Sequence, residues 1–260
     1  MSSRVKTLLI LFIVTAAALG YALTPQTVGE GPFSLKKVSC SLLPPSTLHL
    51  PPSTFHLPPS SFHLPPSTKD TIRQRILFIG DSMLEGLMRR FADYAAENGH
   101  ELNVVLWYSS STERWGTTPV LDRYMEKYRP TFIVICLGSN ELFVRDLPER
   151  DKYVARMVQK MDSVPFVWIS PPNWRKDTGI NDLIVRQIGS QRFFDSRRLT
   201  LERGSDHIHP TMHAAARWMD SVAVWMSSTQ TAHPILMNRP QKKGKVAHFT
   251  LLQPEYEGND

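Results

Sequence analysis

Between residues 73 and 230 the hydrophobic positions follow two alternating patterns. Short, continuous apolar runs are typical of strands buried on both faces of a sheet, and they lie at 75–79, 103–107, 131–137, 165–169 and, more weakly, 192–195. Apolar residues spaced three and four apart are typical of amphipathic helices, and they lie at 83–98, 120–128, 149–161 and after Pro210. Strands alternate with helices, which predicts an α/β domain with a doubly wound, mostly parallel sheet covered by helices on both faces.

Polar residues follow two of the predicted strands directly. Ser82 comes after Gly80-Asp81, and Asn140 comes after Gly138-Ser139. In a doubly wound sheet, ligands bind outside the carboxyl ends of the strands. We therefore expect Ser82 and Asn140 to lie at one edge of the sheet.

A nearly continuous apolar run, Leu8 to Leu23, precedes this domain and follows Arg4 and Lys6. The pattern fits either a signal anchor or a cleaved signal peptide, so residues 1–24 are assigned to one of the two. The cationic flank stays in the cytoplasm by the positive-inside rule. The prediction is a membrane-anchored protein whose folded domain is extracytoplasmic (periplasmic), or a secreted one if the segment is cleaved.

Residues 25–72 form a low-complexity linker in which Leu-Pro-Pro-Ser begins a seven-residue repeat at Leu43, Leu50 and Leu57. Two prolines in each repeat exclude a helix and favour an extended polyproline II spacer. The histidines of successive repeats lie about 20 Å apart in that conformation, too far to share one metal ion. The folded domain is expected at 73–230, followed by a C-terminal tail at 231–260.

The formal net charge of +6 is modest for 260 residues, and the basic residues are dispersed apart from a small group near the C-terminus. No zinc knuckle, phosphate-binding loop or basic helix accompanies them, so nucleic acid is not an expected partner. No cluster of His, Cys and Asp has the spacing of metal ligands, and the predicted chemistry requires no metal and no cofactor.

The chemistry is carried by Ser82 together with Asp206 and His209. A serine hydroxyl becomes a nucleophile when an imidazole takes its proton and a carboxylate orients that imidazole. Asp206 and His209 are three residues apart, so both can project from one short turn, and the Asn140 amide can donate to an oxyanion. Each piece alone is common in turns and helix caps. The three together, in this order, predict a serine hydrolase.

These motifs resemble those of the SGNH (GDSL-like) hydrolase family over residues 75 to 227, and the chain resembles its membrane-anchored esterase and acyltransferase members. The resemblance implies the three-layer, flavodoxin-like fold of that family. It also implies a nucleophile at Ser82, a base at His209, an orienting carboxylate at Asp206, and an oxyanion hole formed by Asn140 and the Ser82 N–H.

Two positions depart from the family pattern. Glu141 stands where an Asp usually ends the third block, outside the catalytic roles. In the second block a serine stands where a glycine N–H usually completes the oxyanion hole, which leaves Ser110 or Ser111 as the donor. Gly138 and Trp174 are further candidates for substrate contacts, and for Trp174 core packing is an equal alternative.

Three functions remain open on the sequence alone. The first is a serine esterase that removes acyl groups, O-acetyl above all, from cell-envelope glycans or from another small ester. The second uses the same residues as a glycan O-acyltransferase, with a membrane partner that supplies the acyl group. The third is a catalytically degenerate domain that binds glycans or serves in assembly.

Overall fold

The computed structural model describes residues 27–28, 35–36 and 73–257. The chain divides into two compact units, Met1–His63 and Leu64–Asp260. In the first unit, β1 (Thr27–Val28) pairs antiparallel with β2 (Leu35–Lys36) inside the predicted linker. The predicted membrane segment, Leu8 to Leu23, and the proline repeats lie outside the described residues. No helix among the described residues is long and apolar enough to cross a membrane.

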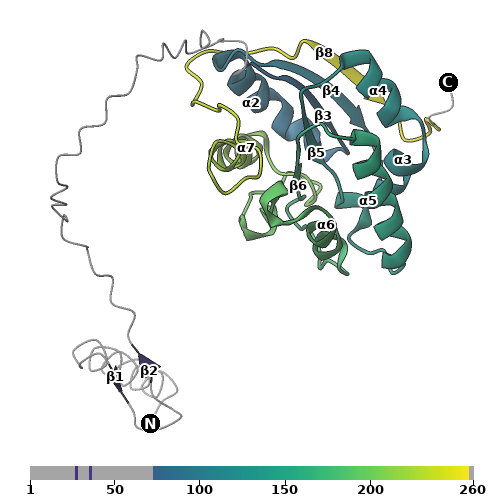
Figure 1. Cartoon of the computed structure of the whole chain (residues 1–260), viewed down its shortest axis with the longest axis vertical. Helices are drawn as coiled ribbons and strands as arrows, with labels where there is room; N and C mark the ends of the chain where they lie inside the picture. The colour runs from purple at the N-terminus through teal and green to yellow at the C-terminus, as the bar shows by residue number, and fades with distance from the viewer. Residues whose placement is uncertain (1–26, 29–34, 37–72, 258–260) are drawn as a thin grey trace, which may run out of the picture. The chain divides into compact units, whose positions relative to one another are not determined.

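The second unit is built on a parallel sheet in the strand order β7-β6-β5-β3-β4-β8. β3 lies between β4 and β5, so the chain reverses its direction of travel across the sheet there (Figure 1). Ligand sites of doubly wound sheets lie at such a reversal. The strands are β3 (Arg75–Gly80), β4 (Glu101–Trp107), β5 (Phe132–Cys136), β6 (Phe166–Ile169), β7 (Phe193–Phe194) and β8 (His248–Leu252).

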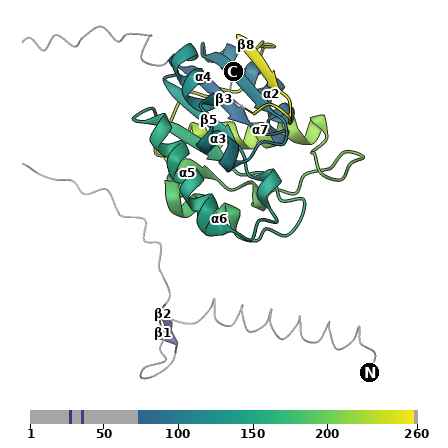
Figure 2. The same ribbon diagram turned by 90° about the vertical axis from the view of Figure 1, so that its right-hand side faces the viewer.

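Helices cover both faces of this sheet, as the pattern predicts (Figures 1 and 2). One face packs against α2 (Met83–Glu97) and α7 (Met212–Met226). The other packs against α3 (Thr112–Thr117), α4 (Val120–Tyr128), α5 (Leu147–Met161) and α6 (Ile180–Ile188). Short 3₁₀ helices follow β5 (η3, Ser139–Glu141) and flank β7 (η4, Ser190–Arg192, and η5, Ser196–Arg198).

Local signals place the helix ends. Asp146 caps α5 by accepting the Glu149 N–H, and Thr211 caps α7 by accepting the Ala214 N–H at 3.2 Å. Arg129 ends α4 in a left-handed conformation (φ 43°) just before Pro130. The predicted bounds of α2, α4 and α5 lie within two residues of the observed ones. Two short elements, α3 and α6, were not predicted, although α6 is as long as α4.

The predicted C-terminal tail is wrong in part, because residues 231–257 belong to the fold. β8 adds a parallel strand beside β4, with His248 opposite Asn103 and Leu252 opposite Trp107. The Trp107 indole donates to the Gln253 carbonyl at 3.1 Å, and the Tyr256 ring packs edge-on against it. β8 is an edge strand with mixed burial, so it lacks the continuous apolar run by which the central strands were recognised.

Candidate active site

Ser82 lies between the carboxyl end of β3 and the first turn of α2. A side chain at Gly80 would place its Cβ 2.0 Å from the Cys136 carbonyl oxygen, so only glycine allows β3 to pass β5 this closely. The Asp81 N–H donates to the same carbonyl at 3.1 Å. Ser82 is therefore held at the point where the sheet reverses, at the positive end of a 15-residue helix.

Asp81 is fully buried and connects the two predicted motifs. Its carboxyl oxygens accept the N–H of Met83 at 3.0 Å and the N–H of Ser139 at 3.2 Å. Burial raises the pKa of Asp81 to about 7, and these two N–H donors act against the rise. The carboxyl group thereby fixes the turn that carries Asn140 relative to Ser82.

His209 contacts both Ser82, which lies 127 residues earlier in the chain, and Asp206, which lies three residues earlier. The His209 Nε2 lies 2.8 Å from the Ser82 Oγ, and its Nδ1 lies 2.6 Å from Asp206 Oδ2. A carboxylate at Nδ1 favours the tautomer with the proton there, which leaves Nε2 to accept the serine proton. The structure thus brings together the three residues predicted from sequence, in the order that a nucleophile, its base and an orienting carboxylate require.

The loop that carries Asp206 and His209 is closed by its own hydrogen bonds. The N–H groups of Ile208 and His209 donate to Asp206 Oδ1 at 2.9 and 3.0 Å. The His209 ring and these N–H groups hold the pKa of the Asp206 carboxyl well below its usual range. Asp206 therefore stays ionised wherever His209 can act as a base. His207, one residue before Ile208, has φ 59° and is exposed.

Arg203 fixes this loop to the rest of the site, a role that the sequence analysis missed. Its guanidinium donates to the Ile208 carbonyl at 2.5 Å and to the Pro172 carbonyl at 3.0 Å. The first carbonyl belongs to the loop of His209, and the second to the segment that follows β6. An isolated arginine gives no sequence signal for such a contact, because both acceptors are backbone atoms of distant segments.

Asn140 lies in η3, exposed, with its amide turned toward the second block. One hydrogen of the Nδ2 group goes to the Ser110 carbonyl at 2.9 Å. An amide carries two such hydrogens, so a second donor remains for a substrate oxygen. Gly138 precedes η3 with φ 122° and is buried. It shapes the turn, and a contact between Gly138 and a substrate stays a prediction.

Ser110 and Ser111, the two candidates for the second oxyanion donor, differ in their hydrogen bonds. The Ser110 N–H donates to the Trp107 carbonyl at 3.2 Å, and its buried hydroxyl accepts the Trp115 indole N–H. Ser110 is therefore occupied, and the prediction that it donates is wrong. The N–H groups of Ser111 and Ser82 have no acceptor within residues 73–257. The left-handed conformation that favours glycine occurs in this segment at Ser109, one residue before Ser110, with φ 56°.

Glu141 links η3 to Thr112, a structural role that the sequence analysis did not predict. Its buried carboxyl accepts the N–H of Thr112 at 2.8 Å and the Thr112 hydroxyl at 2.6 Å. Arg150 lies 3.6 Å away as a partial counter-charge. Burial raises the pKa of Glu141, and the Thr112 donors oppose the rise. Glu141 ties η3 to the start of α3, which sets Asn140 beside the second block.

Trp174 packs partly against the core and also contacts this turn. Its indole N–H donates to the Ser139 hydroxyl at 3.2 Å, and its ring meets Phe143 edge to face at 5.2 Å. Arg175 stacks on both rings. Phe143 is 46% exposed, so the two rings and the Arg175 cation form a shelf that solvent reaches, and Trp174 joins it to Ser139, the neighbour of Asn140.

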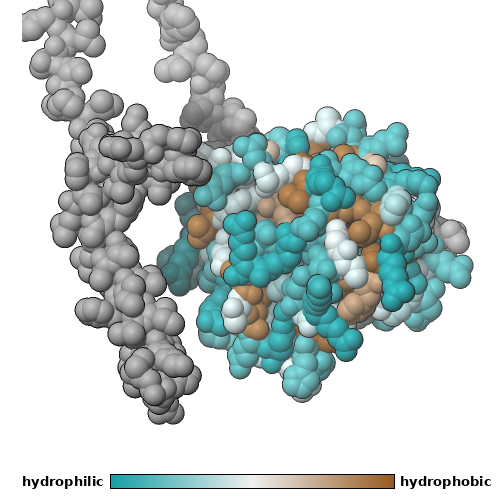
Figure 3. All heavy atoms as spheres, turned by 90° about the horizontal axis from the view of Figure 1, so that it is seen from below, coloured by the Kyte–Doolittle hydropathy of each residue, from teal (hydrophilic) through white to brown (hydrophobic). Residues whose placement is uncertain are grey.

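The site is open to solvent. The side chains of Asp206 and His209 are 47% and 40% exposed, although their partner Ser82 is half-buried. The face in Figure 3 is mainly hydrophilic, with hydrophobic side chains in separate areas. Within the described part of the chain, no three His, Cys, Asp or Glu residues are grouped so that they could hold a metal ion.

Comparison with known proteins finds only distant likenesses. No family model matches the chain, and no curated protein matches it in sequence. One similar solved structure is a proposed acylhydrolase from Bacteroides fragilis, with a TM-score of 0.41 and 17% identity over 62% of this chain and 90% of that one. Another is a gut microbial enzyme that metabolises diltiazem, with a TM-score of 0.38 and 15% identity over 60% of this chain and 48% of that one. These likenesses are too weak to assign a reaction.

Proposed function

We propose that the chain is a serine ester hydrolase with Ser82 as its nucleophile. The observation that carries this proposal is the continuous contact from Asp206 through His209 to Ser82, at 2.6 and 2.8 Å. Few structural roles require an exposed imidazole to join a carboxylate to a serine at the amino end of a helix. The same three groups in this order are what acyl transfer to a serine needs.

In the proposed reaction, Ser82 Oγ attacks the acyl carbon while His209 Nε2 takes its proton. The carbonyl oxygen becomes an oxyanion, which the second Asn140 hydrogen and the N–H groups of Ser82 and Ser111 would stabilise. His209 then returns the proton to the departing alkoxide, and an ester of Ser82 remains. Water attacks that ester with His209 again as base, which releases the acid and restores the serine.

We further propose that the substrate is an O-acylated glycan, with O-acetyl as the leading case. An open site suits an ester carried on a polymer, and the side chains of Asp206 and His209 are 47% and 40% exposed. The shelf of Phe143, Trp174 and Arg175 offers aromatic faces to a sugar ring and a cation to an acidic one. An extracytoplasmic location, proposed from the apolar segment Leu8 to Leu23, would place the site among envelope glycans.

A fluorophosphonate probe and an acetate-release assay test the proposal. Ser82→Ala should abolish both labelling and turnover of p-nitrophenyl acetate without changing the melting temperature. Ser205→Ala is the matched control, because Ser205 is exposed in the loop that carries His209, and it should label like the wild type. Acetate release from an acetylated glycan supports hydrolysis, whereas transfer seen only with a sugar acceptor supports the acyltransferase alternative. Labelling that survives Ser82→Ala would refute the assignment.

A further inference from the structure

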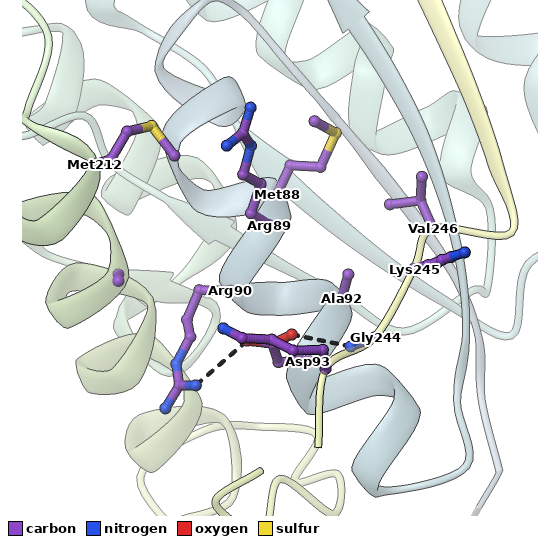
Figure 4. Close-up of a pocket in the computed structure, with 11 residues that line it drawn as sticks. Met88, Arg89, Arg90, Ala92, Asp93, Met212, Gly244, Lys245 and Val246 are labelled. Carbon is purple, nitrogen blue, oxygen red and sulfur yellow. Dashed lines mark hydrogen bonds and ion pairs between the residues drawn. The ribbon is translucent and has the colours of Figure 1, made fainter. Parts of the chain in front are cut away.

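A cavity lies where residues 243–246 cross α2 beside the start of α7, and Ser82 is not among the residues that line it (Figure 4). Its volume is about 660 Å³, which is within the range of small-molecule sites. The crossing is close, because a Cβ at Gly244 would lie 1.9 Å from the Ala92 carbonyl oxygen. Its walls therefore come from three segments that the fold holds in contact, one of them in the region predicted to be a free tail.

The lining of the cavity is mainly apolar. Met88 and Ala92 come from α2, Met212 and Ala216 from α7, and Val246 from the crossing segment. Met212 is 49% exposed, so solvent reaches its side chain. Methionine side chains are flexible and polarisable, so they adapt to ligands of irregular shape, alkyl chains among them.

The charged residues around the cavity divide into a paired and an unpaired set. The Asp93 carboxyl is buried, with 6% of its side chain exposed, and it accepts the Gly244 N–H at 2.9 Å and contacts Lys243 at 3.2 Å. Arg90 contacts Asp93 at 3.4 Å and Asp220 at 2.7 Å. These groups compensate one another, as the dashed lines of Figure 4 show in part.

Arg89 and Lys245 are the unpaired set. Neither has a carboxylate within 4.0 Å among residues 73–257, and both are exposed. In Figure 4 the Arg89 side chain extends from α2 between those of Met88 and Met212, whereas Lys245 lies beside Val246 on the crossing segment. An apolar cavity with two uncompensated cations at its rim is complementary to a ligand with an apolar chain and an anionic head.

We propose that this cavity binds a single-chain anionic amphiphile, with its alkyl chain against Met88, Met212 and Val246 and its head group on Arg89 or Lys245. Carboxylate and phosphate monoester heads share the chemistry that the two cations recognise. This site is separate from Ser82 and does not depend on the function proposed above.

Calorimetric titration of the full-length protein with decyl phosphate and decanoate tests the proposal. We expect at least one of them to bind, and the stronger of the two identifies the head group. Shortening that ligand should weaken binding by about fourfold for each methylene removed. Inorganic phosphate and decyltrimethylammonium should not bind, because the first lacks the chain and the second has the wrong charge. Equal affinity for the cationic amphiphile would overturn the proposal.

Variants locate the binding. Arg89→Glu combined with Lys245→Glu should weaken decyl phosphate by about tenfold or more, and Ala216→Phe should weaken it by filling the cavity. Arg186→Glu, an exposed arginine on α6 across the sheet, is the charge control and should have no effect. Unchanged melting temperatures would show that these variants fold. Binding that survives the cavity variants, or that disappears after fluorophosphonate labelling of Ser82, would place the ligand elsewhere and refute the site.

Discussion

At the scale of single residues, the chemistry of the site depends on which donors are already in use. Asn140 gives one amide hydrogen to the Ser110 carbonyl, and that contact fixes the direction of the other. Ser110 is itself held in place, because its N–H and hydroxyl both have partners. A donor fixed before the substrate arrives needs no reorganisation during the reaction, which is the condition for effective oxyanion stabilisation.

Asn140→Ala should therefore lower kcat by about 10²–10³ with little change in KM, since the lost hydrogen bond forms mainly in the transition state. Steady-state kinetics on p-nitrophenyl acetate measure both constants. Asn173→Ala is the control, because that amide contacts the Asn181 side chain and not the second block. A change confined to KM would mean that Asn140 binds the ground state instead.

The buried carboxyl of Asp81 should make stability depend on pH. Its pKa is raised to about 7 in the folded chain, against 3.8 for the ordinary group, so between these values the native state holds a proton that the unfolded state has lost. Stability then falls as pH rises, by up to about 1.4 kcal/mol per pH unit.

Urea unfolding at pH 5, 6 and 7 measures that slope. Asp81→Asn removes the titration, so its stability should vary less steeply with pH than that of the wild type. At each pH, subtracting the free energy of unfolding of the variant from that of the wild type cancels the contribution of groups that titrate in both, such as histidines. Parallel slopes would show that Asp81 is ionised in the native protein throughout this range.

At the scale of secondary-structure elements, the structure adds β8, a strand in the segment that was predicted to be a tail. It pairs with β4 at five positions, and the segment beyond it covers Trp107. The segment before it is also anchored, since the Asn98 side chain exchanges hydrogen bonds with the Asn238 backbone at 2.8 and 3.0 Å. Residues after α7 therefore complete one edge of the sheet.

A chain that ends at Gln241 should lose about 3–5 kcal/mol of stability, because the ladder between β4 and β8 disappears and each net hydrogen bond is worth about 1 kcal/mol. Urea unfolding followed by tryptophan fluorescence measures the loss. A chain that ends at Glu257 is the control and should match the full-length protein. Equal midpoints for all three chains would mean that β8 contributes nothing to the fold.

At the scale of the whole molecule, the chain divides into two units, Met1–His63 and Leu64–Asp260. Both core clusters consist of residues between Ile76 and Met237, all in the second unit. Within the described residues, the first unit contributes the β1–β2 pair, whose only pairing is internal. The proposed esterase site and the proposed amphiphile cavity both belong to the second unit.

A chain that starts at Leu64 should keep the melting temperature and the esterase rate of the full-length protein, because it retains both core clusters. Differential scanning calorimetry and p-nitrophenyl acetate turnover measure the two properties. A chain that starts at Met83 lacks β3, the strand between β4 and β5, and should not fold. A large loss of stability on removing residues 1–63 would show that the first unit supports the domain.

The sequence by itself determined the parts of the fold that depend on long buried patterns. A central strand such as β5 is apolar at every position, and a helix such as α2 repeats its apolar positions over four turns, so each can be recognised without its neighbours. The motifs at Ser82, Asn140 and Asp206–His209 were recognisable because their order along the chain is informative. Their convergence on one edge of the sheet follows from the parallel topology.

Only the tertiary structure decided the features that depend on contacts between distant segments. β8 lacks a continuous apolar pattern because an edge strand is only partly buried. Its pairing with β4 depends on where the fold places the segment after α7. The choice between Ser110 and Ser111 required knowing which N–H was already bonded. Arg203 and Glu141 act through backbone atoms or a single hydroxyl on other segments, and no local pattern records such partners. Hydrophobic periodicity is local and survives in the sequence, whereas the use of each polar atom is settled by what the fold places beside it.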